Sequence, residues 1–356
     1  MKKNQLIVGL AVLAVIAALV IWGRDKIHFD FALFRAQLAH VDWKRIAIGT
    51  GCIYLAYVFR ALRWAYLLRH NKKVHPLSLL GTQVIGFTAV ALIGRVADPV
   101  RPYLVSKKTG LPLSNQIAVY IVERLFDAGT MALIFSSSIL IASWFGGPGA
   151  LPHPELVRKA GYWGMAGTLA GAAFLVAVRF SGNFVAAFFE QTLGVLSKKI
   201  GQAVGHKIRE FRTGLDTMRS LTDFGAVTGL SITMWVLIAA AYLETMKAFV
   251  ADPQLAAMTV PKCVLLMVVS GVSSIVQLPV LGWFTQIGLV ATAISKFLDV
   301  SPEPATACAA TLLLTTFLGI VPIGLIWAQI DHVSLRKVTA ESEHAEEDLE
   351  AAEAAK

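Results

Sequence analysis

Six stretches of this chain are apolar, almost free of charged residues and long enough to cross a membrane as single helices. The hydrocarbon core of a bilayer is about 30 Å thick, which takes about 20 helical residues. Only 15% of the 356 residues are charged, whereas charged residues make up about a quarter of a soluble domain. The sequence therefore predicts an all-α polytopic membrane protein, with six full spans near residues 4–23, 46–68, 116–145, 160–179, 225–246 and 305–330.

Two further apolar segments, residues 74–94 and 263–295, do not fit single straight crossings. The first is rich in Gly, Thr and Gln and ends in GRVADPVRP, where two prolines are expected to break a helix. The second would be about 50 Å long as one helix at 1.5 Å per residue, and QLPVLGW interrupts it at residues 277–283. Irregular backbone at membrane depth is tolerated where protein or a wet cavity satisfies its polar groups. We therefore expect two re-entrant or broken helical segments.

The distribution of Lys and Arg indicates the orientation. If residues 74–94 are re-entrant, almost twice as many basic residues lie inside as outside, and a full crossing reverses that ratio. The positive-inside rule favours the re-entrant interpretation. This topology places both termini and a basic loop at residues 180–224 in the cytoplasm, and we expect the protein in the inner membrane. Residues 1–335 would form one transmembrane domain, followed by an acidic cytoplasmic tail at 336–356 that is solvated and either partly helical or disordered.

The order of the segments predicts a weak inverted repeat. Each broken segment precedes a short linker and a long apolar helix, and the two segments open to opposite faces in this topology. KKTGLPLSNQIAVYIVERL and SKFLDVSPEPATACAATLL occupy the corresponding positions. Many transporters have this arrangement, with the binding site at the interface between the repeats.

Composition excludes other classes of partner and site. The net charge of +9 comes from loops between apolar segments, where basic residues orient helices and meet anionic lipid, so we expect no nucleic-acid partner. The three cysteines stand singly in apolar runs without the paired spacing of a metal site or disulfide. They are predicted to be packing residues, and no metal or cofactor is expected.

Charged residues open the apolar run YIVERLFDAGTMALIF at residues 120–135. Glu123 and Asp127 lie one helical turn apart on the same face. At that depth an unpaired ionised group costs a few kcal/mol or more, so both are expected to face the protein interior. Arginines near the end of the second span and in the loop at 94–102 are their expected partners. The predicted cluster comprises Arg60, Arg63, Arg95, Asp98, Arg101, Glu123, Arg124 and Asp127.

Five arginines and three carboxylates leave this cluster with a surplus of positive charge. Planar guanidinium groups suit bidentate binding of phosphate, which points to an anionic phosphate headgroup. In this hypothesis Arg101 and Arg124 face the phosphate, while Glu123 and Asp127 hold the arginines or relay a proton. The alternative is a set of internal salt bridges, with Arg63 extending toward the interface at a helix end.

The run GFTAVALIGRVADPVRPYLVSKKTGLPLSNQIAVYIVERLFD, preceded by RALRW, resembles the transmembrane domain of bacterial lysylphosphatidylglycerol synthases and the related flippase-like membrane proteins. That family shows a helix ending in Arg-Trp, a Pro-x-Arg-x-Gly-Glu-x-x-Arg loop and a Glu-Arg-x-x-Asp helix. The resemblance covers roughly residues 40–330 and is most specific in the first half. It implies that the loop motif falls on Arg95, Asp98 and Arg101, and the helix motif on Glu123, Arg124 and Asp127.

The chain departs from the family pattern at identifiable positions. Ala97 stands where the loop glycine is usual. In the second half, the family's Pro-Gly-Gly-x-Gly-x-x-Glu pattern corresponds to residues 279–286, where most glycines are lost and Gln286 replaces Glu. We include Gln277 and Gln286 among the candidate substrate-binding residues. The synthases also carry a soluble aminoacyl-transfer domain, for which the acidic tail is too short.

The leading functional hypothesis is a lipid translocase for an anionic phospholipid or a polyprenyl-phosphate-type lipid. A second hypothesis is a non-catalytic partner of a membrane glycosyltransferase or another cell-envelope lipid or glycan synthase, docked through the basic loop. A third, less favoured, is a lipid-modifying enzyme that uses Glu123 and Asp127 as acid and base. The sequence contains neither a His-Glu-x-x-His pair nor a Gly-x-x-x-x-Gly-Lys loop, so it predicts no enzyme and no catalytic residue.

Overall fold

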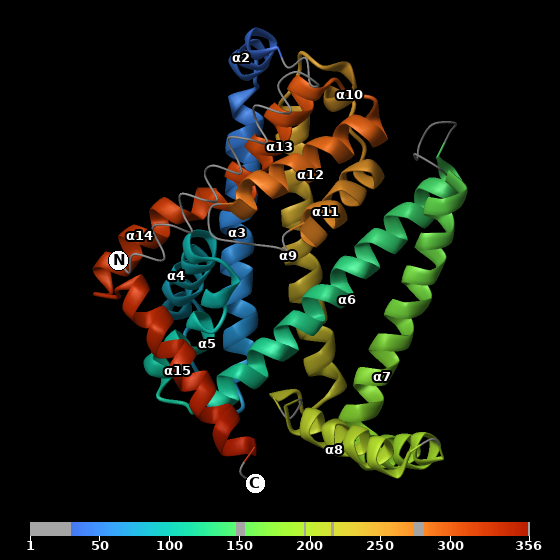
Figure 1. Cartoon of the computed structure of the whole chain (residues 1–356), viewed down its shortest axis with the longest axis vertical. Coiled ribbons are helices and arrows are strands. Elements are labelled where there is room, and N and C mark those ends of the chain that lie inside the picture. Colours follow the sequence, from blue (N-terminus) through green and yellow to red (C-terminus); the bar gives the residue numbers. More distant parts are fainter. Residues whose placement is uncertain (1–29, 147–153, 196, 215–216, 274–280, 355–356) are drawn as a thin grey trace.

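The computed structural model describes residues 30–146, 154–195, 197–214, 217–273 and 281–354, and within these ranges it contains helices and no strand (Figure 1). The predicted all-α polytopic fold is confirmed. Five helices are long and apolar enough to cross a membrane, or six if one bent pair counts as a single span. The predicted helix at 4–23 and Gln277 lie outside the described residues. By length and composition alone, the candidate spans are α3 (Trp43–Leu68), α4 (Pro76–Ile93), α6 (Leu113–Phe145), α7 (Pro154–Gly194), α9 (Leu221–Lys247), and the bent pair α13 (Pro302–Thr316) with α14 (Val321–Ile330). The course of the chain after α4 distinguishes a full crossing from a re-entrant one.

Helices α3 and α9 form an antiparallel pair at the centre of the molecule (Figure 1). At one end, Asp42 N donates to Ala248 O at 2.9 Å. At the other end, Arg69 of the α3 C-terminus pairs with Asp223 in the first turn of α9. The capping box of Ser220 and Asp223 fixes the start of α9 at that level. Contacts at both ends therefore set the two helices in opposite directions.

The first broken segment consists of α4, the short helix η1 (Arg95–Ala97) and α5 (Val100–Thr109). Lys72 Nζ, before α4, donates to Thr109 O at the end of α5 at 2.6 Å, so the chain returns to the side from which it entered. The break lies at Gly94, whose φ is 96°, a conformation that glycine adopts without strain. The prolines expected to break the helix instead lie at the start of α5, Pro99 just before it and Pro102 in its first turn, where a missing N–H costs little.

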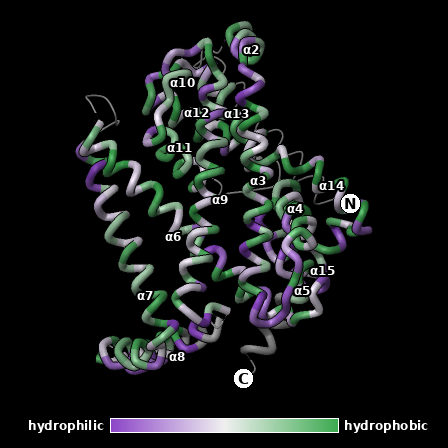
Figure 2. Tube along the Cα trace, turned by 180° about the vertical axis from the view of Figure 1, so that it is seen from behind, coloured by the Kyte–Doolittle hydropathy of each residue, from purple (hydrophilic) through white to green (hydrophobic). Residues whose placement is uncertain are grey.

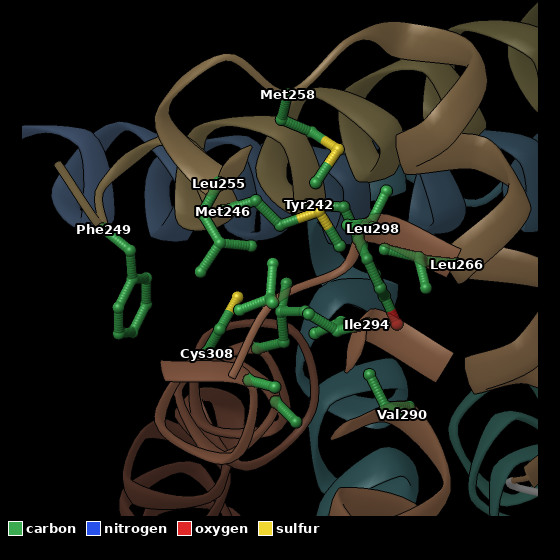
Figure 3. Close-up of a cluster of buried hydrophobic side chains, with 14 of the residues drawn as sticks. Tyr242, Met246, Phe249, Leu255, Met258, Leu266, Val290, Ile294, Leu298 and Cys308 are labelled. Carbon is green, nitrogen blue, oxygen red and sulfur yellow. The ribbon is translucent and has the colours of Figure 1, made fainter. Parts of the chain in front are cut away.

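The second broken segment consists of α11 (Val260–Ser273) and α12 (Leu281–Leu298), which follow the short helix α10 (Pro253–Ala256). Met258 before α11, Leu266 within it, and Ile294 and Leu298 of α12 share one hydrophobic cluster (Figure 3). This segment therefore also returns to the side from which it started, at the end of the molecule opposite to α4 and α5 (Figure 1). Cys308 packs in the same cluster, as predicted for a packing residue.

The two halves share one order of elements. In the first, α3 is followed by α4 and α5 and then by α6; in the second, α9 is followed by α11 and α12 and then by α13. Because α3 and α9 run antiparallel, the halves are inverted, in agreement with the predicted arrangement. Helix α2 (Phe31–Ala39) precedes the first half, and Asp30 N at its cap donates to Glu303 of α13 at 3.1 Å.

The predicted span at 305–330 is not one straight helix but a bent pair of helices. Helices α13 and α14 meet at an angle of 41° across Phe317 and the short helix η3 (Leu318–Ile320). The hydroxyl of Tyr54 donates to Gly319 O at 3.1 Å, which satisfies a carbonyl at the break. Past the bend, α14 packs against α4, where Gly324 touches Thr88 so closely that a larger residue would not fit.

Residues 180–224, predicted as a basic cytoplasmic loop between spans, are largely helical, and their side of the membrane stays a prediction. Helix α7 continues past a non-helical residue at Ser181, and α8 (Lys198–Gly214) folds back along it. The stretch has no proline, and its apolar residues Val204 and Ile208 recur at helical spacing. The resulting hairpin lies across the lower end of the molecule in Figure 1, and Figure 2 shows that α8 carries many hydrophilic residues.

The acidic tail is helical, one of the two forms that the sequence predicts, but its first turns are packed rather than solvated. It forms α15 (Leu335–Ala354), whose first turns pack against α5 and η1. Glu341 accepts hydrogen bonds from Tyr103 Oη at 2.8 Å and from Lys107 Nζ at 2.9 Å. Ser342 is fully buried. The tail therefore covers the outside of the first broken segment.

The re-entrant course of α4 and α5 predicts how cysteines label in sealed vesicles. In a chain whose native cysteines are replaced by alanine, Asn71→Cys and Lys108→Cys flank the segment and should react with an impermeant maleimide from the same side. Gln254→Cys, next to the second broken segment, should react only from the other side. Labelling of positions 71 and 108 from opposite sides would show that α4 crosses the membrane fully and would contradict this fold.

Candidate functional site

Two carboxylates of α6 lie against two arginines of α3. Arg60 Nη1 donates to Glu123 Oε1 at 2.9 Å, while Arg63 bridges Glu123 Oε1 and Asp127 Oδ1, each at 2.8 Å. Arg60 and Arg63 are one turn apart on α3, and Glu123 and Asp127 are one turn apart on α6, so the two pairs face each other. All four residues are less than a tenth exposed. The predicted interior pairing is present.

Arg101 reaches the same carboxylate from α5. Its Nη1 lies 3.2 Å from Glu123 Oε2 and 3.1 Å from Gln83 Oε1, and its guanidinium lies 4.5 Å from the centre of the Phe87 ring. The side chain crosses α4 at Gly86, where any Cβ would overlap it. A glycine at this position therefore lets α4 and α5 close around the arginine.

Arg101 was expected to face a phosphate, and its position does not support that role. It is 1% exposed and does not belong to the described residues that line the neighbouring cavity. The rings of Trp64 and Tyr120, at 5.5 and 5.0 Å, complete an aromatic enclosure around the cation. The sequence motif located Arg101 correctly near Glu123, but only the folding of α5 against α4 places it behind the cavity wall.

Arg124 is the most open member of the cluster. Its Nη2 lies 3.3 Å from Asp127 Oδ2, and its side chain is 38% exposed, against 10% or less for Arg60, Arg63 and Arg101. Arg95 and Asp98 form a separate pair at 3.8 Å, with side chains that are 45% and 28% exposed.

Within the described ranges, four arginines thus contact two carboxylates, which leaves two positive charges in excess. Two side chains of α9 that are not among the predicted cluster residues complete the cluster. Ser231 accepts from Arg63 Nη1 at 2.8 Å, and Trp235 Nε1 donates to Asp127 Oδ1 at 3.2 Å. Their spacing of one helical turn in an otherwise apolar span is the signal that indicates a shared inward face.

A cavity of about 430 Å³ adjoins the cluster, within the range of about 300–1,000 Å³ that ligand pockets occupy. Arg60 and Arg124 line it from α3 and α6, and Gln286 lines it from α12. Helices α4 and α11 also contribute to its wall, so both broken segments border the same space. Its polar lining residues are Tyr57, Arg60, Arg95, Asp98, Arg124, Trp235, Tyr242, Ser270, Gln286 and Thr316.

The family model described as the lysylphosphatidylglycerol synthase TM region matches residues 6–324. The chain belongs to this family. The match includes the charged cluster and both broken segments, and it confirms the resemblance that the sequence motifs indicate. A search of the curated proteins gives no match.

The arrangement predicts that Glu123→Gln destabilises the fold, because it leaves three buried guanidinium groups short of their main counter-charge. Breaking a buried ion pair in this way costs about 3–5 kcal/mol. The measurement is the free energy of unfolding in detergent micelles, from equilibrium denaturant titration. The control is Glu155→Gln, because Glu155 and its partner Arg158 form an ion pair in which both side chains are exposed. For this variant we expect a loss of less than about 1 kcal/mol in the free energy of unfolding. Equal stability of the two variants would contradict the proposed dependence.

Proposed function

We propose that the protein is a lipid translocase that moves a phosphate-bearing lipid between the two leaflets. The supporting observation is the excess of two positive charges at the wall of a cavity between membrane spans. Cations at membrane depth are costly unless they meet anions or water. A phosphate headgroup in the cavity supplies the missing negative charge, while its acyl chains remain in the bilayer.

The arginines divide into two roles in this proposal. Arg60 and Arg124 line the cavity and offer guanidinium groups to the phosphate. Arg63 and Arg101 are buried behind them and position Glu123 and Asp127. Neither carboxylate is among the described residues that line the cavity, which favours transport over acid–base chemistry on a lipid.

Movement of the headgroup requires the cavity to open to each side in turn. The two broken segments touch where Trp283 Nε1 of α12 donates to Ala91 O of α4 at 3.1 Å. We propose that a shift of these segments against each other alternates the access, as in other proteins with inverted repeats. The distribution of basic residues supports a cytoplasmic location for the end that carries α8, and we propose that the protein lies in the inner membrane.

The test is transbilayer movement of fluorescent phosphatidylglycerol in proteoliposomes, followed by quenching of the outer leaflet. We expect Arg124→Gln and Arg60→Gln each to lower the initial rate at least tenfold, because each removes half of the excess charge. Arg45→Gln is the matched control. Arg45 also belongs to a membrane span, pairs with Glu244 and has a side chain that is 39% exposed, but it does not line the cavity.

Two outcomes would exclude this function. One is the absence of movement above empty vesicles for every phospholipid headgroup tried. The other is a rate for Arg124→Gln that equals the rate for Arg45→Gln.

A further inference from the structure

The cavity has a second polar region, contributed by the other half of the protein. Tyr242 Oη donates to Ser270 Oγ at 2.8 Å, and Gln286 Nε2 donates to the same oxygen at 3.1 Å. The Tyr242 hydroxyl also interacts with Thr316. These four residues lie on α9, α11, α12 and α13, and all four line the cavity. Four helices thus bring uncharged hydrogen-bonding groups to one place.

One of these groups lacks a partner. Gln286 is only 7% exposed, and its Oε1 has no hydrogen-bond partner in the described part of the chain. A buried acceptor left unpaired is costly. The terminal torsion of a glutamine side chain is soft, so a small turn of the carboxamide directs this oxygen into the cavity. A hydrogen-bond donor on an occupant would then satisfy it.

The charges around the cavity restrict which donor fits. The charged lining residues, Arg60, Arg95, Asp98 and Arg124, all belong to the first half of the protein, and no described lining residue of α9, α11, α12 or α13 is charged. An ammonium group beside Gln286 would lose its water without gaining a carboxylate. The excess positive charge of the cluster would also repel it. A hydroxyl group makes the same hydrogen bond without either cost.

We propose that the cavity recognises a headgroup in two parts, a phosphate at Arg60 and Arg124 and an uncharged, hydroxylated substituent at Gln286, Ser270 and Tyr242. The substrate class is therefore a phosphodiester lipid that carries glycerol or a sugar, and amine-bearing headgroups are disfavoured. This inference rests on the proposed function, because it takes the cavity to be the site of the lipid headgroup.

The experiment measures equilibrium binding of short-chain lipids to the purified full-length protein in detergent. The probes are dihexanoyl phosphatidic acid, phosphatidylglycerol and phosphatidylethanolamine, with farnesyl phosphate and a farnesyl phosphohexose as a second pair. We expect phosphatidylglycerol to bind at least tenfold more tightly than phosphatidic acid, or the farnesyl phosphohexose to bind at least tenfold more tightly than farnesyl phosphate, or both. Each preferred probe should also bind at least tenfold more tightly than phosphatidylethanolamine. A preference for phosphatidylglycerol identifies glycerol as the substituent that the site recognises, and a preference for the phosphohexose identifies a sugar.

Variants of Gln286 separate this recognition from simple attraction to phosphate. Gln286→Ala should reduce the preference to about twofold or less and leave the binding of phosphatidic acid unchanged. Gln286→Glu should instead increase the binding of phosphatidylethanolamine relative to wild type, because it introduces a carboxylate for the ammonium group. Thr292→Ala, an exposed position on the same helix, is the control and should change neither quantity.

Equal affinity of the wild-type protein for the hydroxylated and the amine-bearing probes would overturn the proposal, and this comparison needs no variant. An undiminished preference in Gln286→Ala would overturn it as well. Selective binding without transbilayer movement would reject the translocase function and leave the recognition site in place. Movement of all headgroups at one rate, with no selectivity in binding, would reject the recognition site and leave the translocase function.

Discussion

The burial of Glu123 and Asp127 among arginines is the interaction on which the site depends. These carboxylates join α6 to α3 through Arg60 and Arg63, to α5 through Arg101, and through Asp127 to Trp235 of α9. None of these ions is tolerable alone in an apolar interior. Each charged helix can therefore bring its ions to this depth only if the oppositely charged helices are packed against it. The packing of the four helices is thus coupled through the neutralisation of these buried charges.

The broken segments provide the space that this cluster needs. A straight helix satisfies its own backbone along its whole length, and it offers no helix end at membrane depth. The end of α4 at Gly94 and the division of the second segment into α11 and α12 bring helix ends and side chains such as Arg95 and Gln286 to the level of the cavity. The two halves share an element order, yet the first supplies the charges and the second supplies neutral groups.

The first broken segment is also held from outside. Helix α14 packs on α4 after the bend at Phe317, and α15 binds α5 through Glu341. The C-terminal part of the chain is thus in contact with the segment that carries Arg95, Asp98 and Arg101. A rearrangement of α4 and α5 relative to the second half would have to carry α14 and α15 along or break their contacts.

The sequence by itself determined the helical membrane class, the approximate positions of the spans α3, α6, α7 and α9, and the pairing of Glu123 and Asp127 with arginines from other segments. These follow from hydropathy and from the cost of unpaired ions, which depend on residue type and spacing alone. Only the tertiary structure decided that Arg101 lies behind the cavity wall, that α13 and α14 bend apart, and that Ser231, Ser270 and Tyr242 join the site. Those facts depend on which helix faces meet. A single polar residue in an apolar helix does not specify which residue, far away in the sequence, it will contact.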